Sequence, residues 1–166
     1  YESGLMRVSH NLDPERVTTS VELASGISWA WSMGADVINC SWGDHGGQLP
    51  GLHTSALEDA IDNALTWGRS GKGCVVVFAA GNEAPAMDYP GTFDDRIITV
   101  GSIGNTGVRS TFSGYGTKLD VVAPGENIMT TYPNYMSGLA SATSMATPHV
   151  SGIAALIISE NPSLTR

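Results

Sequence analysis

Charged residues are scarce in this sequence. Only 14% of the 166 residues are Asp, Glu, Lys or Arg, whereas soluble domains carry about a quarter. The net charge is −8, and no run of basic residues occurs. Nucleic acids and anionic membranes are bound through clustered Lys and Arg, so this composition argues against both classes of partner. No uninterrupted apolar stretch approaches the roughly 20 residues of a membrane-spanning helix.

Cysteine is rare as well, and the start of the chain shows no leader. Cys40 and Cys74 fit neither a zinc-ligand spacing nor a disulfide framework. Each lies in an apolar run, so both are predicted to be buried free thiols. The N-terminus has no signal peptide and no initiating Met, which predicts that this chain continues a longer protein. The acidic residues show no calcium-loop spacing, so no metal ligand is predicted.

Strand-like apolar runs alternate with helical patterns along the chain. Helices are predicted over 18–33, 54–67 and 144–159, and short strands over 5–8, 36–41, 74–80, 97–101 and 119–122. This alternation predicts a mostly parallel α/β sheet with helices on both faces. Ligands of such sheets gather at the carboxyl ends of the strands, and the polar segments Ser41–Gly43 and Gly81–Glu83 fall there.

Ser144 stands at the start of the last predicted helix. Apolar residues surround this helix almost completely, which predicts that it is buried. The free N–H groups and the dipole of a helix N-terminus stabilise developing negative charge, and Pro148 is expected to fall where its missing N–H has no helical partner. Taken singly, Ser144 is more typical of a helix cap, and Asn82 of a turn residue after a strand.

The neighbouring segments favour a different interpretation. Five of them resemble, in family order, segments of the subtilisin-like serine proteases, the subtilase family: ADVINCSWG, VVVFAAGNEA, YPGTFDDRIITVGSI, STFSGYGTKLDVVAPGENIMTT and ATSMATPHVSGIAALI. The resemblance covers nearly the whole chain. It implies a three-layer subtilisin-like fold that is incomplete at its N-terminal side, with residues 1–166 forming part of a catalytic domain.

The resemblance also implies roles for particular residues. Ser144 takes the place of the nucleophile, and Asn82 that of the oxyanion-hole asparagine, whose NH₂ would act with the Ser144 N–H on a carbonyl oxygen. The substrate-binding positions are Ser41, Trp42, Gly43, Ala80 and Gly81. The implied activity is hydrolysis of a polypeptide substrate through an acyl-enzyme. The family further implies a secreted or cell-envelope location, and it implies that calcium can be bound, although no calcium ligands are identified here.

A base for Ser144 is not evident in the sequence. The family's Asp-(Ser/Thr)-Gly and His-Gly-Thr settings do not occur. His149 lies about 140° around the helix from Ser144, so it is predicted to be a packed histidine near the helix start. His10, His45 and His53 are interpreted as surface or structural histidines. The chain alone is therefore predicted to be catalytically incompetent and, with its apolar faces uncovered, able to self-associate.

Two other functions are alternatives to the protease. A pseudoprotease or peptide-binding module would keep the cleft without catalysis, and it is favoured by the missing base and by Ala142, which stands where the family usually has glycine. An α/β-hydrolase esterase requires glycines flanking its serine at alternate positions, where this chain has Ala142 and Ala146. Glu83 is interpreted as a solvated carboxylate at the rim, and a cis bond is predicted for Tyr89-Pro90.

Overall fold

The structure, a computed structural model, describes residues 3–9 and 19–166. Its elements in chain order are α1 Thr19–Ser32, β1 Val37–Cys40, the 3₁₀ turn η1 Pro50–Leu52, α2 Ser55–Gly71, β2 Val75–Ala79, β3 Ile98–Ile103, β4 Val121–Pro124, β5 Ile128–Tyr132, β6 Met136–Ala140 and α3 Thr143–Glu160. None of the helices among the described residues is both long and apolar enough to cross a bilayer.

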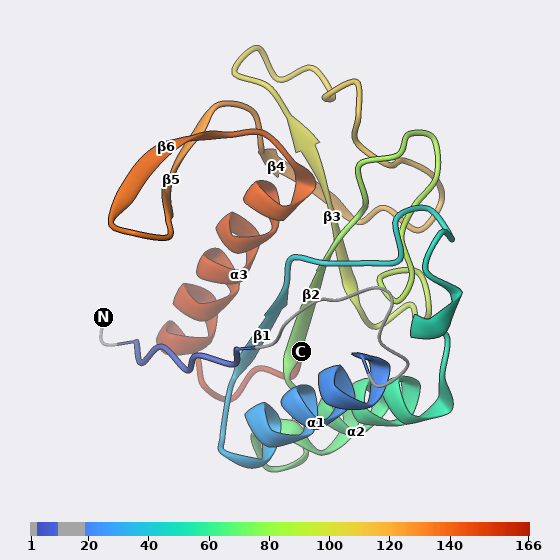
Figure 1. Ribbon diagram of the computed structural model, residues 1–166. Coiled ribbons are helices and arrows are strands. Elements are labelled where there is room, and N and C mark those ends of the chain that lie inside the picture. Colours follow the sequence, from blue (N-terminus) through green and yellow to red (C-terminus); the bar gives the residue numbers. More distant parts are fainter. Residues whose placement is uncertain (1–2, 10–18) are drawn as a thin grey trace.

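Four parallel strands form the central sheet in the order β1-β2-β3-β4. Helix α3 packs along one face of the sheet, and α1 and α2 lie together on the other (Figure 1). The predicted three-layer α/β fold with helices on both faces is therefore confirmed. Because all four strands run the same way, their carboxyl ends meet at one edge, which carries the candidate site.

Strand β2 contributes side chains to the hydrophobic cores on both faces of the sheet. All five of its residues are buried, as its run of apolar and β-branched side chains predicts for a strand covered on two faces. Val76 and Phe78 belong to the core beneath α1 and α2, whereas Val75 and Val77 belong to the core beneath α3. The two-residue period of a strand produces this division.

The helices on the α1/α2 face begin and end close to the predicted positions. Thr54 caps α2, its side chain accepting from the Leu57 N–H. Gly68 has a ψ of 158°, so the regular helical backbone ends at Trp67, where the apolar period also ends. The buried thiols are confirmed, because Cys40 and Cys74 are both free and buried, and burial raises the pKa of Cys74 to about 11.

Helix α3 differs from its prediction. Ile153, Leu156 and Ile157 are 57%, 50% and 52% exposed, so the expectation of a helix buried nearly all round is wrong. Only the face turned to the sheet is covered, by residues such as Ala146 and Ile158. An apolar helical surface is buried only where a second element packs on it, and no element of the described chain covers this side.

One further prediction fails, one element was not predicted, and one prediction is confirmed. Residues 5–8 are described but form no β-strand, because no strand pairs with them and Leu5 is 98% exposed. The antiparallel hairpin of β5 and β6 was not predicted; it arches out to one side of the first part of α3 (Figure 1). The Tyr89-Pro90 peptide bond is cis, as predicted.

Candidate active site

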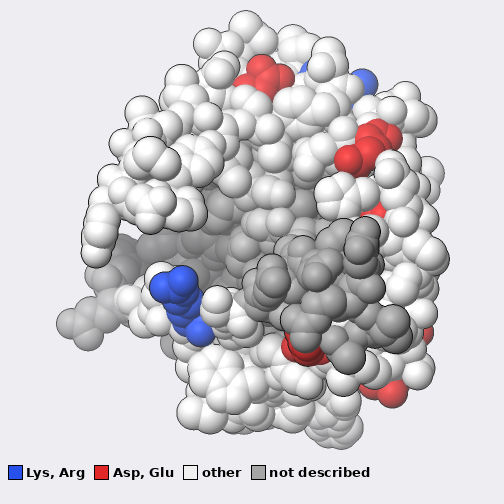
Figure 2. All heavy atoms as spheres, in the orientation of Figure 1, with Lys and Arg blue, Asp and Glu red and all other residues white. Residues whose placement is uncertain are grey.

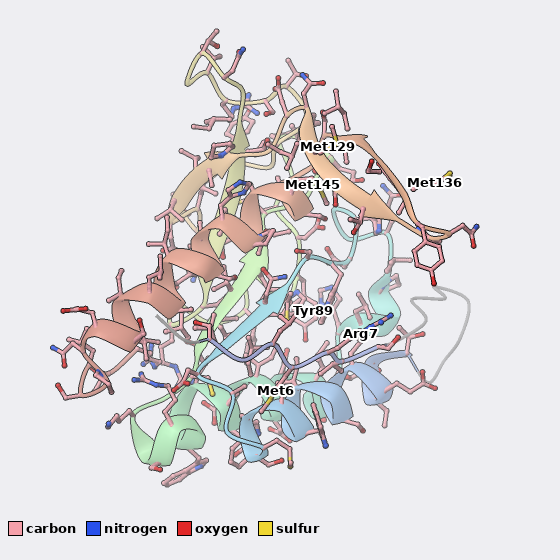
Figure 3. The ribbon with its side chains drawn as sticks, turned by 90° about the vertical axis from the view of Figure 1, so that its left-hand side faces the viewer. Met6, Arg7, Tyr89, Met129, Met136 and Met145 are labelled. Atoms are coloured by element: carbon pink, nitrogen blue, oxygen red, sulfur yellow. The ribbon has the colours of Figure 1, made fainter. Side chains whose placement is uncertain are left out.

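Ser144 is the second residue of α3 and is half-buried at the carboxyl edge of the sheet. Its hydroxyl donates to the carbonyl oxygen of Ser41 at 3.0 Å, and the Ser41 hydroxyl donates to the carbonyl oxygen of Ser144 at 3.0 Å. This reciprocal pair joins the start of α3 to the residue that follows β1. Met145, the next residue, lies at the end of α3 nearest the hairpin (Figure 3).

Pro148 explains why the Ser144 carbonyl needs that donor. In an α-helix the N–H of residue 148 would donate to the carbonyl of residue 144, and proline has no N–H. Because α3 begins at Thr143, Pro148 is inside the helix, and the expectation that its missing N–H has no helical partner is wrong. The hydroxyl of Ser41 replaces the bond that Pro148 removes.

Asn82 follows β2 and reaches across to the start of α3. Its Oδ1 accepts from the Thr143 N–H at 2.8 Å and from the Thr143 hydroxyl at 3.1 Å. Ala142 makes no side-chain cap, so Asn82 caps α3 from a distant loop. Because the Thr143 N–H can bond only to an acceptor, the Asn82 amide must turn its oxygen toward Thr143. The Asn82 NH₂ group then points away from Thr143.

Ala142 is accommodated without backbone strain. Its φ is −171° and its ψ is 162°, which is extended backbone open to any residue. Its N–H donates to the Gly125 carbonyl at 2.9 Å. Ala142 therefore introduces no backbone strain before Ser144.

The predicted substrate-binding residues lie on two neighbouring strand ends. Ser41–Gly43 follow β1, and Ala80 and Gly81 follow β2, its parallel partner in the sheet. Trp42 packs edge-on against Phe78, with ring centroids 5.0 Å apart, and contacts the core beneath α1 and α2. The half-buried Trp42 side chain is therefore partly engaged in the core, and its role in binding substrate stays a prediction.

Two buried aspartates behind these strand ends were not identified from the sequence. Asp44, 2% exposed, accepts from the Tyr89 N–H at 3.0 Å and contacts His53 Nε2 at 2.8 Å. Asp88, 5% exposed, accepts from the Gly46 N–H at 2.8 Å. Acidic residues beside glycines are common in surface loops, so only the fold reveals that these two are buried.

The structure corrects the interpretation of His149. Its side chain is exposed and its Nδ1 lies 2.9 Å from the Met145 carbonyl, because its side of α3 carries no covering element. His45 is exposed beside Glu83 at 3.4 Å, and His53 stacks on Tyr89 with ring centroids 3.9 Å apart. His10 lies outside the described residues.

None of the three described histidines shares a hydrogen bond with Ser144. Within residues 3–9 and 19–166, the Ser144 hydroxyl bonds to Ser41 and to no histidine. Across the same ranges, no group of three or more His, Cys, Asp or Glu residues is placed to hold a metal ion. What the site presents is a hydroxyl at a helix N-terminus, flanked by the amide of Asn82, an arrangement suited to stabilising an oxyanion.

Comparison with known proteins places this arrangement in a family. Subtilisin DY of Bacillus licheniformis is 40% identical over 148 residues, covering 86% of this chain and 50% of the relative. Subtilisin E of Bacillus subtilis is also 40% identical over 148 residues, with 36% of the relative covered. The chain therefore spans half or less of the length of these curated relatives.

Solved structures agree with the sequence relatives. A cold-adapted subtilisin-like serine proteinase superposes with a TM-score of 0.71 at 35% identity, covering 89% of this chain and 50% of that one. The prenylagaramide maturation protease PagA superposes with a TM-score of 0.75 at 28% identity, covering 92% of this chain and 54% of that one. The sequence profile of the Subtilase family, Peptidase_S8, matches residues 5–166. This chain belongs to the subtilase family.

Proposed function

We propose that the protein carrying this chain is a serine endopeptidase whose nucleophile is Ser144. Ser144 attacks a peptide carbonyl, and an upstream histidine oriented by an upstream aspartate takes the hydroxyl proton and passes it to the leaving amine. The acyl-enzyme formed on Ser144 is then hydrolysed by water. Because no histidine of the described ranges is hydrogen-bonded to Ser144, the 166-residue chain on its own is proposed to be inactive.

The orientation of Asn82 is the observation that carries this proposal. Its oxygen is held by Thr143, beside Ser144, so its NH₂ is free to donate to an oxyanion at that hydroxyl. The Ser144 N–H is the second donor, since the first turn of a helix offers it no intrahelical acceptor. Donors fixed before the reaction stabilise the developing charge without reorganisation.

The substrate is proposed to be an extended polypeptide. Backbone groups of Ser41–Gly43 and of Ala80 and Gly81 would pair with it as an added strand, which gives affinity with little dependence on sequence. Figure 2 shows Lys and Arg dispersed over the face it draws, without a continuous basic patch. A secreted or cell-envelope location and a calcium requirement are proposed from the family alone.

A fluorophosphonate probe tests the nucleophile. We expect the longer protein to be labelled covalently and the Ser144→Ala variant to remain unlabelled. Ser159→Ala is the matched control, because Ser159 lies on the same helix with its hydroxyl bonded to the Leu156 carbonyl. Labelling that survives in Ser144→Ala, or protease turnover by the 166-residue chain alone, would contradict the proposal.

A peptide-binding module without catalysis is the second candidate. It is favoured by the Ser144 hydroxyl, which donates to the Ser41 carbonyl rather than to a histidine in the described chain. The sequence preceding Tyr1 separates the two functions. Asp-(Ser/Thr)-Gly followed by His-Gly-Thr supports the protease, and absence of either supports the binding module.

A further inference from the structure

The side chain of Asp88 lies between the two glycines at the proposed substrate-binding edge. A Cβ atom placed on Gly43 would overlap the Oδ2 of Asp88, and a Cβ atom placed on Gly81 would overlap its Oδ1. Any side chain at either glycine would therefore have to displace the carboxylate. Because neither glycine has a side chain, the Asp88 carboxylate occupies the space between the two strand ends.

The charge of Asp88 is only partly offset by its own chain. Oδ1 accepts from the Gly46 N–H, but in the described ranges no Lys, Arg or His forms an ion pair with the carboxylate. The two histidines nearby are engaged elsewhere, since His45 contacts Glu83 and His53 contacts Asp44. A carboxylate that is 95% buried without a cation is unfavourable for stability.

The electrostatic surroundings increase this imbalance. Burial is the main cause that raises the pKa of Asp88, and the charges of Glu83 and Asp44 raise it further, whereas the Gly46 N–H bond and the charge of His45 lower it. A site where acidic groups repel one another attracts a cation from outside. Buried groups perturbed in this way are concentrated at functional sites, where a ligand supplies what the protein lacks.

Asp88 is also close enough to the candidate nucleophile to contact a bound substrate. Gly43 is two residues beyond Ser41, whose carbonyl accepts from Ser144, and two extended residues span about 7 Å. Gly81 immediately precedes Asn82. The long side chain of Lys or Arg can cover such a distance from a backbone held at Ser144.

We propose that Asp88 is a specificity-determining residue that binds the charged end of a substrate Lys or Arg side chain, the residue on the amino side of the bond to be cleaved, where this side chain reaches the carboxylate held between Gly43 and Gly81. The guanidinium or ammonium group pairs with Oδ2 while Gly46 continues to hold Oδ1. This proposal rests on the proposed function, because it assigns the substrate class of the same site.

Peptidyl p-nitroanilides that differ only in the residue before the scissile bond test the proposal in the longer protein. We expect kcat/KM for Arg and Lys to exceed that for Leu and Phe by at least tenfold. Asp88→Asn should lower kcat/KM for Arg and Lys at least tenfold and leave Leu and Phe unchanged or improved. Asp95→Asn is the control of equal charge, since Asp95 is exposed and pairs with Lys118, and it should change none of the four.

Preference for Leu or Phe in the unmodified protein would overturn the proposal, and so would an equal loss on all four substrates in Asp88→Asn. Asp88→Ser is the second variant if thermal melting shows that Asp88→Asn does not fold.

Binding measured without catalysis separates this inference from the proposed function. Fluorescent peptides with Arg, Lys, Leu or Phe at the same position are titrated against Ser144→Ala and against Ser144→Ala/Asp88→Asn. If no substrate is cleaved but Arg and Lys peptides bind at least tenfold more tightly through Asp88, the protease proposal fails and the specificity proposal stands. Equal binding of all four peptides, or binding of none, overturns the specificity proposal.

Discussion

At the scale of single residues, Asn82 combines two tasks in one amide. Its oxygen accepts from the N–H and hydroxyl of Thr143, and its nitrogen is the proposed oxyanion donor. Asn82→Ala should lower kcat by about 10²–10³, the loss that removal of such a donor causes in a subtilisin. The same variant should lower the free energy of unfolding by about 1 kcal/mol, because α3 loses its cap.

Asn82→Asp separates these two tasks. Aspartate keeps an acceptor for Thr143 but has no NH₂ to donate. We expect its urea-unfolding midpoint to stay near that of the unmodified protein while turnover falls at least as far as in Asn82→Ala. Turnover retained in Asn82→Asp would exclude the amide nitrogen from catalysis.

Asp88 makes stability depend on pH in a direction that can be worked out. Burial is the main cause that raises its pKa above the ordinary carboxyl value of 3.8. A group whose pKa is raised by folding stabilises the fold while protonated, and that contribution is lost as pH rises through the folded pKa. Asp88→Asn keeps an oxygen for the Gly46 N–H and removes the charge.

The Asp88→Asn variant should therefore unfold at a higher urea concentration than the unmodified protein at pH 7. The difference should shrink as pH falls toward about 4, the ordinary carboxyl range. Urea titrations at both pH values measure it, and a variant less stable at pH 7 than at pH 4 relative to the unmodified protein would contradict the sign.

The sequence allowed Ser144 and Asn82 to be nominated, but not the bonds that hold them. Ser144 was recognisable from its segment, whereas its exchange of hydrogen bonds with Ser41 joins residues 103 positions apart. Asp44 and Asp88 were missed for a similar reason. Their burial depends on the strand ends being side by side, which no local pattern encodes.

At the scale of elements, the end of β1 and the start of α3 are coupled through Ser41 and Pro148. Ser41→Ala leaves the Ser144 carbonyl without a donor and should destabilise the protein by about 1 kcal/mol. Pro148→Ala restores an N–H that can donate to that carbonyl. In the Pro148→Ala background we expect Ser41→Ala to be milder, with a coupling free energy of at least about 0.5 kcal/mol.

A double-mutant cycle by urea unfolding measures this coupling. Effects of Ser41→Ala and Pro148→Ala that simply add would show that the two residues do not share the Ser144 carbonyl.

The β5–β6 hairpin shows which kind of element could not be predicted from the sequence. Its turn places Asn134 and Tyr135 at φ values of 61° and 59°, a conformation for which Asn-Gly is the usual signal. Its strands are mostly exposed, so they lack the alternation that a half-buried strand shows. The three helices and the strands β1 to β3 were predictable because each buries an apolar face, whereas β4, of which only Ala123 is buried, was predictable from its β-branched residues.

Tyr135→Gly should stabilise the hairpin. A left-handed conformation is unfavourable by about 1–2 kcal/mol for a residue with a Cβ, and Tyr135 is fully exposed, so little packing is lost. We expect a rise of about 1 kcal/mol in the free energy of unfolding, measured by urea titration. Met136→Gly, at a strand position of the same hairpin, should lower it instead, and a rise in both would refute the turn argument.

At the scale of the whole molecule, the elements within residues 3–9 and 19–166 leave one side uncovered. Ile153, Leu156 and Ile157 project from α3, and β1 is an edge of the central sheet. Apolar patches and open strand edges of this kind promote association. The low content of charged residues is consistent with a chain that has more apolar surface to cover.

The 166-residue chain is therefore expected to self-associate. Light scattering after size-exclusion chromatography should give a mass that rises with loading concentration, and Ile153→Lys/Ile157→Lys should reduce it. Val108→Lys is the control, because Val108 is exposed on a different part of the chain. A monomer mass at every concentration would contradict the expectation.

The hydrogen bond between Thr143 and Asn82 also indicates at which stage of folding the site forms. The two residues are 61 positions apart, and the Thr143 N–H has a fixed place only after α3 has docked on the sheet. Before that docking, the Asn82 oxygen lacks the two Thr143 donors that orient it in the folded chain. A collapsed state with its strands and helices formed would thus contain both residues without an oriented amide, so that the proposed oxyanion donor is in place only after the last step of tertiary packing.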